Sequence, residues 1–496
     1  MPPTSTQPTV AIAGGGLAGL AAACALSNAG FRVTLFEKRP FLGGRASSYE
    51  HPGTGEVVDN CQHVLFRVCT NLIEFYQRIG VADQIRWFDQ MNFVEPDGRI
   101  SVLKSSPLPA PLHTAPSFFG FPFLTAADKL ATARALAPLT LRVQQDDGRS
   151  FQQWLDQHGQ TKTAIERFWR PILISALSEE LDQISISSAA QVVRESMKSP
   201  AARHMGVPTV PLTELYNAAG EYIRARGGTL HFRTSLDTFS AGSSQVRVKI
   251  GSEEIAFDYL SLALPFDALD RVLPNAPESA PLREQISHFT NSPITGIHLW
   301  FDRQISDLDH AVLLDRTIQW MFHKSRLQPM RTYVSEEGWK RNERKGLDFS
   351  RADQSPNVGG TLAPEVPSYI ELVVSSSKSL IEKSRSEIID LALAEVREFF
   401  PAARQANLVK STVIKEVNAT YSPRSGIDAH RPPPTTAWPR VFLAGDWTAT
   451  GWPATMEGAV RSGYLAAEAL ARSAGRADVR FLSPDLPATG FMRLFY

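Results

Sequence analysis

The feature that most constrains the fold lies in the first 37 residues. Residues 9–13 are predicted to form a short apolar strand, followed by a Gly-x-Gly-x-x-Gly turn over residues 14–19. The Ala-rich segment 17–28 has high helix propensity, and residues 31–37 alternate as a second strand would. Strand, glycine turn, helix and strand in this order form the βαβ unit of a doubly wound parallel sheet. The predicted fold class is therefore α/β with a Rossmann-type domain.

The glycine turn has the spacing of a dinucleotide-binding site. Gly14 permits the tight turn, Gly16 lets a pyrophosphate approach the backbone, and Gly19 lets helix and strand pack closely. The helix N-terminus, which includes Leu17 and Ala18, offers N–H groups and the positive end of a dipole to the phosphates. Glu37 ends the second strand, where its carboxylate can accept hydrogen bonds from both ribose hydroxyls. An acidic residue at this position argues against a 2′-phosphate on the adenosine ribose of the bound dinucleotide. A glycine-rich turn in another kind of α/β protein is the alternative reading.

A second glycine segment distinguishes nicotinamide from flavin as the bound dinucleotide. Gly43, Gly44 and Arg45 follow the second strand and are not part of the nicotinamide fingerprint. By themselves they could be a plain turn with a solvated arginine. The segment resembles one in flavoproteins of the amine oxidase and phytoene desaturase superfamily, where it lies along the pyrophosphate and the flavin. The resemblance implies FAD contacts from this segment and from Lys38.

The other end of the chain carries the complementary half of the site. A strand at 440–444 runs into Gly445 and Asp446, and a helix rich in small residues is expected at 455–472. Asp446 can accept a hydrogen bond from a ribityl hydroxyl or from a group beside the pyrophosphate. The dipole of the helix can stabilise negative charge on reduced flavin. Alternatively, this segment is an ordinary strand and helix that pack closely against each other without a cofactor. Three further residues are expected to contact FAD: Leu236, Thr455 and Met456.

FAD is therefore the predicted cofactor. Non-covalent binding is expected because no cysteine or histidine stands in a recognised attachment motif. No second glycine fingerprint has the same context, so reducing equivalents would come from an external donor.

Several shorter motifs resemble the family of hydroxysqualene dehydroxylases, the squalene-associated FAD-dependent desaturases of bacterial squalene and hopanoid synthesis. They are the segments 58–65, 69–72, 76–80, 107–113, 292–302, 318–320 and 445–448. The resemblance implies that an allylic hydroxyl of a long apolar isoprenoid is replaced by hydride. A carotenoid or squalene desaturase is the main alternative, because fold and cofactor contacts would be the same. A flavin amine oxidase and a non-catalytic prenyl-lipid escort protein are more distant alternatives.

The implied reaction needs a proton donor beside the flavin in a dry tunnel, since hydroxide is a poor leaving group. His63 is the first candidate, because histidine can hold and release a proton near neutral pH. Asp59 could orient it, or donate directly if burial raises the pKa of its carboxyl. Alternatively, both residues only secure the turn. The candidates for contact with the substrate, which could equally be core or packing residues, are Cys61, His298, Trp300, Trp320 and Trp452.

Composition limits the partners and the compartment. The 51 Lys and Arg balance 51 Asp and Glu, which gives no global attraction to nucleic acid. Three cysteines form no disulfide framework, and the sequence shows no secretory signal or membrane-spanning run. The expected location is the cytoplasm, either free or peripheral on the inner face of the membrane, and no metal site is expected. The phenylalanines of segment 105–125 could dip into the membrane or pack against the protein, and residues 491–496 could add a second anchor or a dimer contact.

The predicted organisation is a discontinuous FAD-binding domain with an inserted α+β substrate domain. The FAD-binding domain is expected to comprise residues 1–60, 206–270 and 405–475, and the substrate domain residues 61–205 and 271–404, mostly helical in the first part. Residues 476–496 are expected to form a tail. Further helices are predicted at 128–141, 152–181 and 378–399, strands at 229–264 and 294–301, and a polar section at about 324–360.

Overall fold

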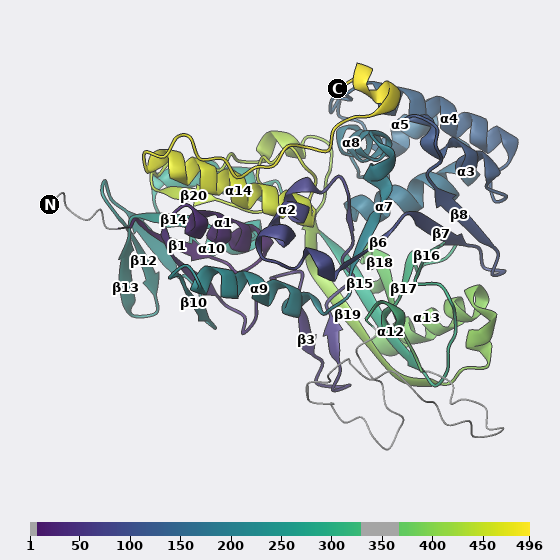
Figure 1. The fold of residues 1–496 in the computed structure, drawn as a ribbon, viewed down its shortest axis with the longest axis horizontal. Helices are drawn as coiled ribbons and strands as arrows, with labels where there is room; N and C mark the ends of the chain where they lie inside the picture. Colours follow the sequence, from purple (N-terminus) through teal and green to yellow (C-terminus); the bar gives the residue numbers. More distant parts are fainter. Residues whose placement is uncertain (1–6, 329–366) are drawn as a thin grey trace, which may run out of the picture.

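A computed structural model describes residues 7–328 and 367–496. Two domains lie side by side in Figure 1, with the parallel sheet and its helices at the left and the larger insert at the right. The predicted polar section at 324–360 lies mostly outside the described residues. Among the described residues, no helix is both long enough and apolar enough to cross a membrane.

The FAD-binding domain is built on a five-stranded parallel sheet, as predicted. Its strand order is β10-β2-β1-β14-β20, and each neighbouring pair runs parallel. The strands come from distant parts of the chain, which confirms the discontinuous doubly wound fold. Their bounds are β1 Thr9–Ala13, β2 Arg32–Glu37, β10 Thr229–Phe232, β14 Tyr259–Leu262 and β20 Val441–Leu443.

Two helices from opposite ends of the sequence pack together on this sheet. Helix α1 (Leu17–Asn28) is buried along almost its whole length, which its many alanines allow. Helix α14 (Met456–Ser473) crosses it so closely that a Cβ on Gly463 would lie 2.2 Å from the carbonyl oxygen of Ala18. The close approach therefore requires small residues on both helices. The domain also contains α9 (Leu212–Arg224), α10 (Phe266–Val272) and an antiparallel sheet of β11 (Thr238–Ala241), β12 (Val246–Ile250) and β13 (Glu253–Phe257).

The substrate domain contains a seven-stranded sheet of order β19-β15-β18-β17-β16-β7-β8. Its strands are β7 Gln90–Val94, β8 Ile100–Lys104, β15 Asn291–Phe301, β16 His310–Leu313, β17 Trp320–His323, β18 Ser368–Ser375 and β19 Leu408–Tyr421. Helix α13 (Arg385–Phe399) packs on it through a shared apolar core. Because β19 pairs with β15 over most of its length, the domain boundary predicted at residue 405 lies too early in the chain.

Helices form the rest of this domain, at the upper right of Figure 1. They are α3 Ala115–Gly120, α4 Ala126–Leu141, α5 Phe151–Gln157, α6 Lys162–Ala164, α7 Arg170–Leu177 and α8 Ile186–Met197, with a π-helical turn at Ile165–Trp169. The continuous helical pattern expected over 152–181 is wrong. Gly159 (φ 61°) and Ser178 (φ 53°) adopt left-handed backbone conformations, and Thr161 starts a new helix as its N-cap.

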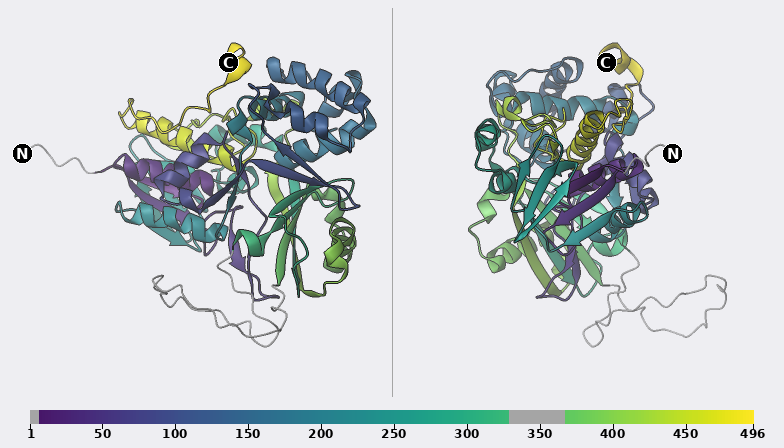
Figure 2. Two further views of the ribbon diagram at one scale, coloured as in Figure 1. Left: turned by 45° about the vertical axis from the view of Figure 1, so that its right-hand side comes forward. Right: turned by 90° about the vertical axis from the view of Figure 1, so that its left-hand side faces the viewer.

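The remaining elements connect the domains or cover their edges. They are β3 Ser48–Glu50, β4 Val57–Asp59, β5 Leu65–Phe66, β6 Ile85–Phe88, β9 Met205–Pro208, α2 Thr70–Arg78, α11 Ala280–Ser287 and α12 Lys324–Leu327. Strand β9 pairs with β5 and β6, so the substrate domain extends slightly beyond the predicted boundary at 206. The C-terminal segment crosses from α14 to the helical part of the substrate domain, as both views of Figure 2 show.

Candidate functional site

One cavity of about 700 Å³ lies where the two domains meet. Fourteen of the fifteen residues predicted to bind the cofactor line it: Gly14, Gly16, Leu17, Ala18, Glu37, Lys38, Gly43, Gly44, Arg45, Leu236, Gly445, Asp446, Thr455 and Met456. The exception, Gly19, packs α1 onto the turn, and a Cβ there would lie 1.9 Å from the carbonyl oxygen of Gly14. The fold thus brings the two ends of the sequence onto one surface.

The first glycine turn has the shape of a phosphate cradle. Gly14 has φ 108°, and a Cβ on it would lie 2.3 Å from the carbonyl oxygen of Ala263. A Cβ on Gly16 would meet only the Cα of Gly44, at 3.8 Å, so the backbone there is open to close approach. No side chain caps the N-terminus of α1. Its N–H groups can therefore bind a phosphate.

Glu37 is held in place by the backbone around it. Its Oε2 accepts a hydrogen bond from the Gly15 N–H at 2.6 Å, and its Oε1 accepts one from the Arg39 N–H at 2.7 Å. Each carboxylate oxygen can accept a further hydrogen bond. The residue is therefore oriented for ribose hydroxyls, as the glycine motif predicts.

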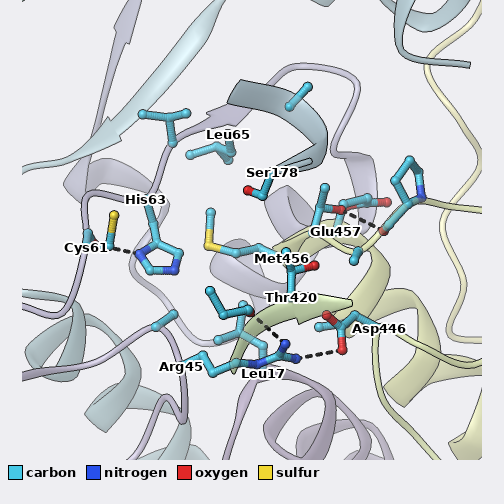
Figure 3. Close-up of a pocket in the computed structure, with 18 of the residues that line it drawn as sticks. Leu17, Arg45, Cys61, His63, Leu65, Ser178, Thr420, Asp446, Met456 and Glu457 are labelled. Atoms are coloured by element: carbon cyan, nitrogen blue, oxygen red, sulfur yellow. Dashed lines mark hydrogen bonds and ion pairs between the residues drawn. The ribbon is translucent and has the colours of Figure 1, made fainter. Parts of the chain in front are cut away.

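Arg45 joins the two halves of the site (Figure 3). Its Nη2 lies 2.6 Å from Oδ1 of Asp446, and its Nη1 donates to the carbonyl oxygen of Ala419 at 2.8 Å. Burial opposes the charge of Arg45, but Asp446 outweighs this and raises the pKa of the guanidinium. The Nδ2 of Asn60, which also lines the cavity, donates to the carbonyl oxygen of Arg45. Asn60 stands inside the 58–65 motif but was not among the predicted site residues.

His63 lies on the cavity wall, in the same turn as Cys61 (Figure 3). Its Nδ1 is 2.8 Å from the carbonyl oxygen of Cys61, so this nitrogen carries the proton and Nε2 is the basic position. Burial lowers the pKa of His63, and the residue is a neutral imidazole at pH 7 rather than a group poised near neutrality. Burial also raises the pKa of the Cys61 thiol well above its usual value. The Cys61 thiol is therefore kept in its neutral form on the cavity wall.

Asp59 has a different role from the one expected. It does not line the cavity, and its Oδ2 lies 2.6 Å from Nζ of Lys324. Ser48 and the backbone N–H of Leu212 donate to its Oδ1, at 2.5 and 3.1 Å. Burial alone would raise the pKa of Asp59, but Lys324 outweighs it and the pKa is lowered. The expectation that burial makes Asp59 a proton donor is wrong.

The predicted substrate contacts divide into two groups. Cys61, Trp320 and Trp452 line the cavity, and the indole N–H of Trp320 donates to Oγ of Ser175 at 2.7 Å.

His298 and Trp300 do not line the cavity, contrary to expectation. They lie on β15 four and six residues beyond Ile294, which does line it, so they are displaced by about 14 and 20 Å along the strand. Nδ1 of His298 is 2.7 Å from the hydroxyl of Tyr369, and Trp300 stacks on that ring with centroids 4.3 Å apart. Burial lowers the pKa of His298 to about 3. Both are core residues.

Beyond the cofactor cradle, the cavity continues as an apolar lobe within the substrate domain. We define this apolar lobe by Phe93, Leu103, Phe118, Leu136, Phe168, Ile172, Val192 and Met197. None was predicted as a site residue, because an apolar residue on an amphipathic element looks the same whether it faces a core or a cavity. Arg203 also lines the cavity, and burial lowers the pKa of its guanidinium to about 10.

Comparison with known proteins agrees with this geometry. The family model described as flavin containing amine oxidoreductase matches residues 17–471. The chain is 27% identical to a 15-cis-phytoene desaturase of Synechococcus elongatus over 482 residues, covering 93% of this chain and 95% of the relative. It is also 27% identical to a probable zeta-carotene desaturase of the same organism, covering 93% and 98%.

Solved structures share the fold at lower identity. An oxidoreductase from Methanosarcina mazei superposes with a TM-score of 0.67 at 16% identity, covering 92% of this chain and 98% of that one. A putrescine oxidase also reaches a TM-score of 0.67 at 16% identity, covering 96% and 100%. The chain thus belongs to the flavin-containing amine oxidoreductase family. It is an FAD-dependent oxidoreductase, which confirms the predicted cofactor.

Proposed function

We propose that this oxidoreductase acts on a long isoprenoid chain and replaces the allylic hydroxyl of hydroxysqualene by hydride, giving squalene. The observation that carries the proposal is the single cavity that joins the FAD cradle to the apolar lobe. An apolar lobe of this kind suits a hydrocarbon chain. Relatives named for phytoene and zeta-carotene, both long hydrocarbon chains, support the same substrate class. The 58–65 motif, which resembles hydroxysqualene dehydroxylases, favours the reductive direction.

Reduced FAD supplies the hydride when it is bound. The protein's own task is to keep water away from the reacting carbon, because water would capture an allylic cation. Phe93, Phe118 and Phe168 present hydrocarbon to the lobe and offer no hydrogen bonds to water. The departing hydroxyl must also receive a proton, so that alcohol, hydride and proton give alkene product and water.

His63 is the residue we assign to that proton transfer, through Nε2. It is the one histidine among the cavity-lining residues that the structure describes. Its Nδ1 is fixed by the carbonyl oxygen of Cys61, which directs the ring and leaves Nε2 for the substrate hydroxyl. Burial lowers the pKa of His63, whereas negative charge close to the ring would raise it. A negatively charged group bound beside His63 would therefore favour the protonated imidazole that the departing hydroxyl needs.

Desaturation is the second candidate function, with flavin accepting hydride instead of donating it. The observation favouring it is the same neutral imidazole, whose basic Nε2 suits a proton acceptor. The names of the curated relatives point in this direction too.

Product analysis of the FAD-loaded protein separates the two functions. Anaerobic protein reduced with dithionite is incubated with hydroxysqualene in detergent, and oxidised protein is incubated with phytoene and a quinone. We expect squalene in the first mixture and unchanged phytoene in the second. The His63→Asn variant should form squalene about 100-fold more slowly with the same affinity. Dehydrogenated phytoene without squalene would establish the desaturase instead.

A further inference from the structure

Two segments at one end of the substrate domain expose large apolar side chains. The C-terminal turn lies against α8 at this end of the molecule (Figure 1), and the loop before α3 contacts it. We call the exposed set the apolar face. Its members, with exposed fractions, are Leu108 (43%), Leu112 (48%), Phe119 (54%), Phe491 (53%), Leu494 (80%), Phe495 (40%) and Tyr496 (52%).

This exposure is built into the fold. The Thr489 N–H donates to the carbonyl oxygen of Lys198 at 3.0 Å, and the Phe491 N–H donates to that of Ala110 at 2.8 Å. Met492 is completely buried. The ring of Tyr496 lies under the cationic groups of Arg194 and Lys198, at 4.2 and 4.6 Å. The C-terminal segment is therefore fixed while its apolar neighbours point to solvent.

The apolar face lies in a basic part of a chain whose overall net charge is zero. Basic side chains contact its members: Nζ of Lys129 donates to the carbonyl oxygen of Phe119 at 2.8 Å, and Arg194 and Lys198 lie over the ring of Tyr496. The acidic neighbour is Glu195, whose Oε1 accepts from the hydroxyl of Tyr496 at 3.2 Å. Positive charge around apolar side chains suits a surface that is negative outside and apolar within.

The same short elements that carry the apolar face also form the wall of the apolar lobe. On α3, Phe118 lines the cavity and its neighbour Phe119 is exposed. In the preceding turn, Thr114 lines the cavity and Leu112 is exposed. The wall between the surface and the lobe is thus one short helix thick.

We propose that the apolar face docks on a lipid bilayer containing anionic lipids, and that the isoprenoid passes between bilayer and cavity beside α3. The second part rests on the proposed function, and the docking itself does not. A second copy of the chain is a less suitable occupant, because a two-fold contact would place the same basic surface against itself. From the sequence, the phenylalanines of segment 105–125 could dip into the membrane or pack against the protein. Phe118, Phe121 and Phe123 are buried, and only Phe119 of these four is exposed, so Phe119 alone is assigned to the docking surface.

Vesicle co-sedimentation of the full-length FAD-loaded protein tests the docking. Vesicles of phosphatidylcholine alone are compared with vesicles that also contain phosphatidylglycerol, at low and high salt. We expect binding to the anionic vesicles that weakens with salt. Phe119→Ser and Leu494→Ser should each weaken it about tenfold. Val417→Ser is the matched control, because Val417 is 51% exposed on β19, away from the apolar face.

Three outcomes would overturn the docking surface. The first is wild type that binds neither kind of vesicle, and the second is binding of the two variants as tight as that of Val417→Ser. The third is wild type that does not bind vesicles but sediments as a dimer in ultracentrifugation, while Leu494→Ser sediments as a monomer. That result would make the apolar face a contact between two copies of the chain.

Activity assays separate the two proposals. The docking variants should reduce hydroxysqualene normally in detergent and slowly when it is embedded in vesicles. Equal rates in vesicles would overturn the entry route. Vesicle binding as expected, with no squalene formed by wild type in either medium, would overturn the proposed function and leave the docking surface standing.

Discussion

Asp59 of β4 and Lys324 of α12 form a buried ion pair, with Oδ2 and Nζ 2.6 Å apart and side chains only 4% and 2% exposed. Lys324 also donates to Oε1 of Gln62 at 2.9 Å and lies 3.4 Å from Oε2 of Glu371. The pair therefore fixes both ends of the short segment that carries Cys61. It acts as a positioning device behind the cavity wall.

Asp59→Asn should strongly destabilise the protein. The substitution leaves the buried ammonium of Lys324 without its closest anion, and removing one partner of a buried pair costs about 3–5 kcal/mol. Urea unfolding of the FAD-loaded protein measures the loss. Asp147→Asn, in an exposed pair with Arg149, should have no measurable effect. Equal stability of Asp59→Asn and wild type would contradict the role of the pair.

The contribution of Glu371 to the free energy of unfolding should fall as the pH rises. Burial raises the pKa of this carboxyl from 4.5 to about 8, so the folded protein binds the proton more tightly than the unfolded chain. Its stabilising contribution is complete below about pH 4.5 and is lost towards pH 8. The pKa of Asp59 is shifted in the opposite direction, so this residue changes the stability at pH values below 3.8, outside the pH range in which Glu371 titrates. Relative to wild type, Glu371→Gln should therefore raise the urea midpoint at pH 8.5 compared with that at pH 5.5, and the surface variant Glu253→Gln should not. Identical pH slopes in wild type and Glu371→Gln would refute this assignment.

Asp446→Asn should weaken FAD binding about tenfold, because it removes a charged partner of Arg45 at the seam between the two ends of the chain. Equilibrium dialysis or flavin fluorescence gives the dissociation constant. The control is Asp270→Asn, which removes an exposed partner of Arg283 and should bind FAD normally. Unchanged affinity of Asp446→Asn would show that the Arg45 pair plays no part in holding the cofactor.

Two tryptophans predicted together from the sequence should behave differently. Trp320→Ala removes a cavity wall and should raise KM about tenfold with little loss of stability. Trp300→Ala removes a core ring stacked on Tyr369 and should cost about 3–5 kcal/mol of stability, with normal KM for the folded fraction. Steady-state kinetics and thermal unfolding of both variants measure the difference. The same KM change in both would place Trp300 against the substrate.

The parts of the fold that could be predicted are those encoded locally. The strand, glycine turn and helix of residues 9–28 follow directly from spacing and composition, and their bounds agree with the structure. The ion pair between Asp59 and Lys324 could not be predicted, because its partners are 265 residues apart. Likewise, strand alternation places His298 and Ile294 on one face of β15 but does not show where along the strand the cavity ends.

A single anaerobic turnover tests the central claim most directly. Photoreduced protein carrying FAD is mixed with hydroxysqualene in detergent, and the flavin absorbance and the lipid products are followed together. The account predicts reoxidation of the flavin with one squalene formed per flavin, and a markedly slower reaction in His63→Asn. A flavin that stays reduced in this mixture, while oxidised protein is bleached by phytoene, would contradict it.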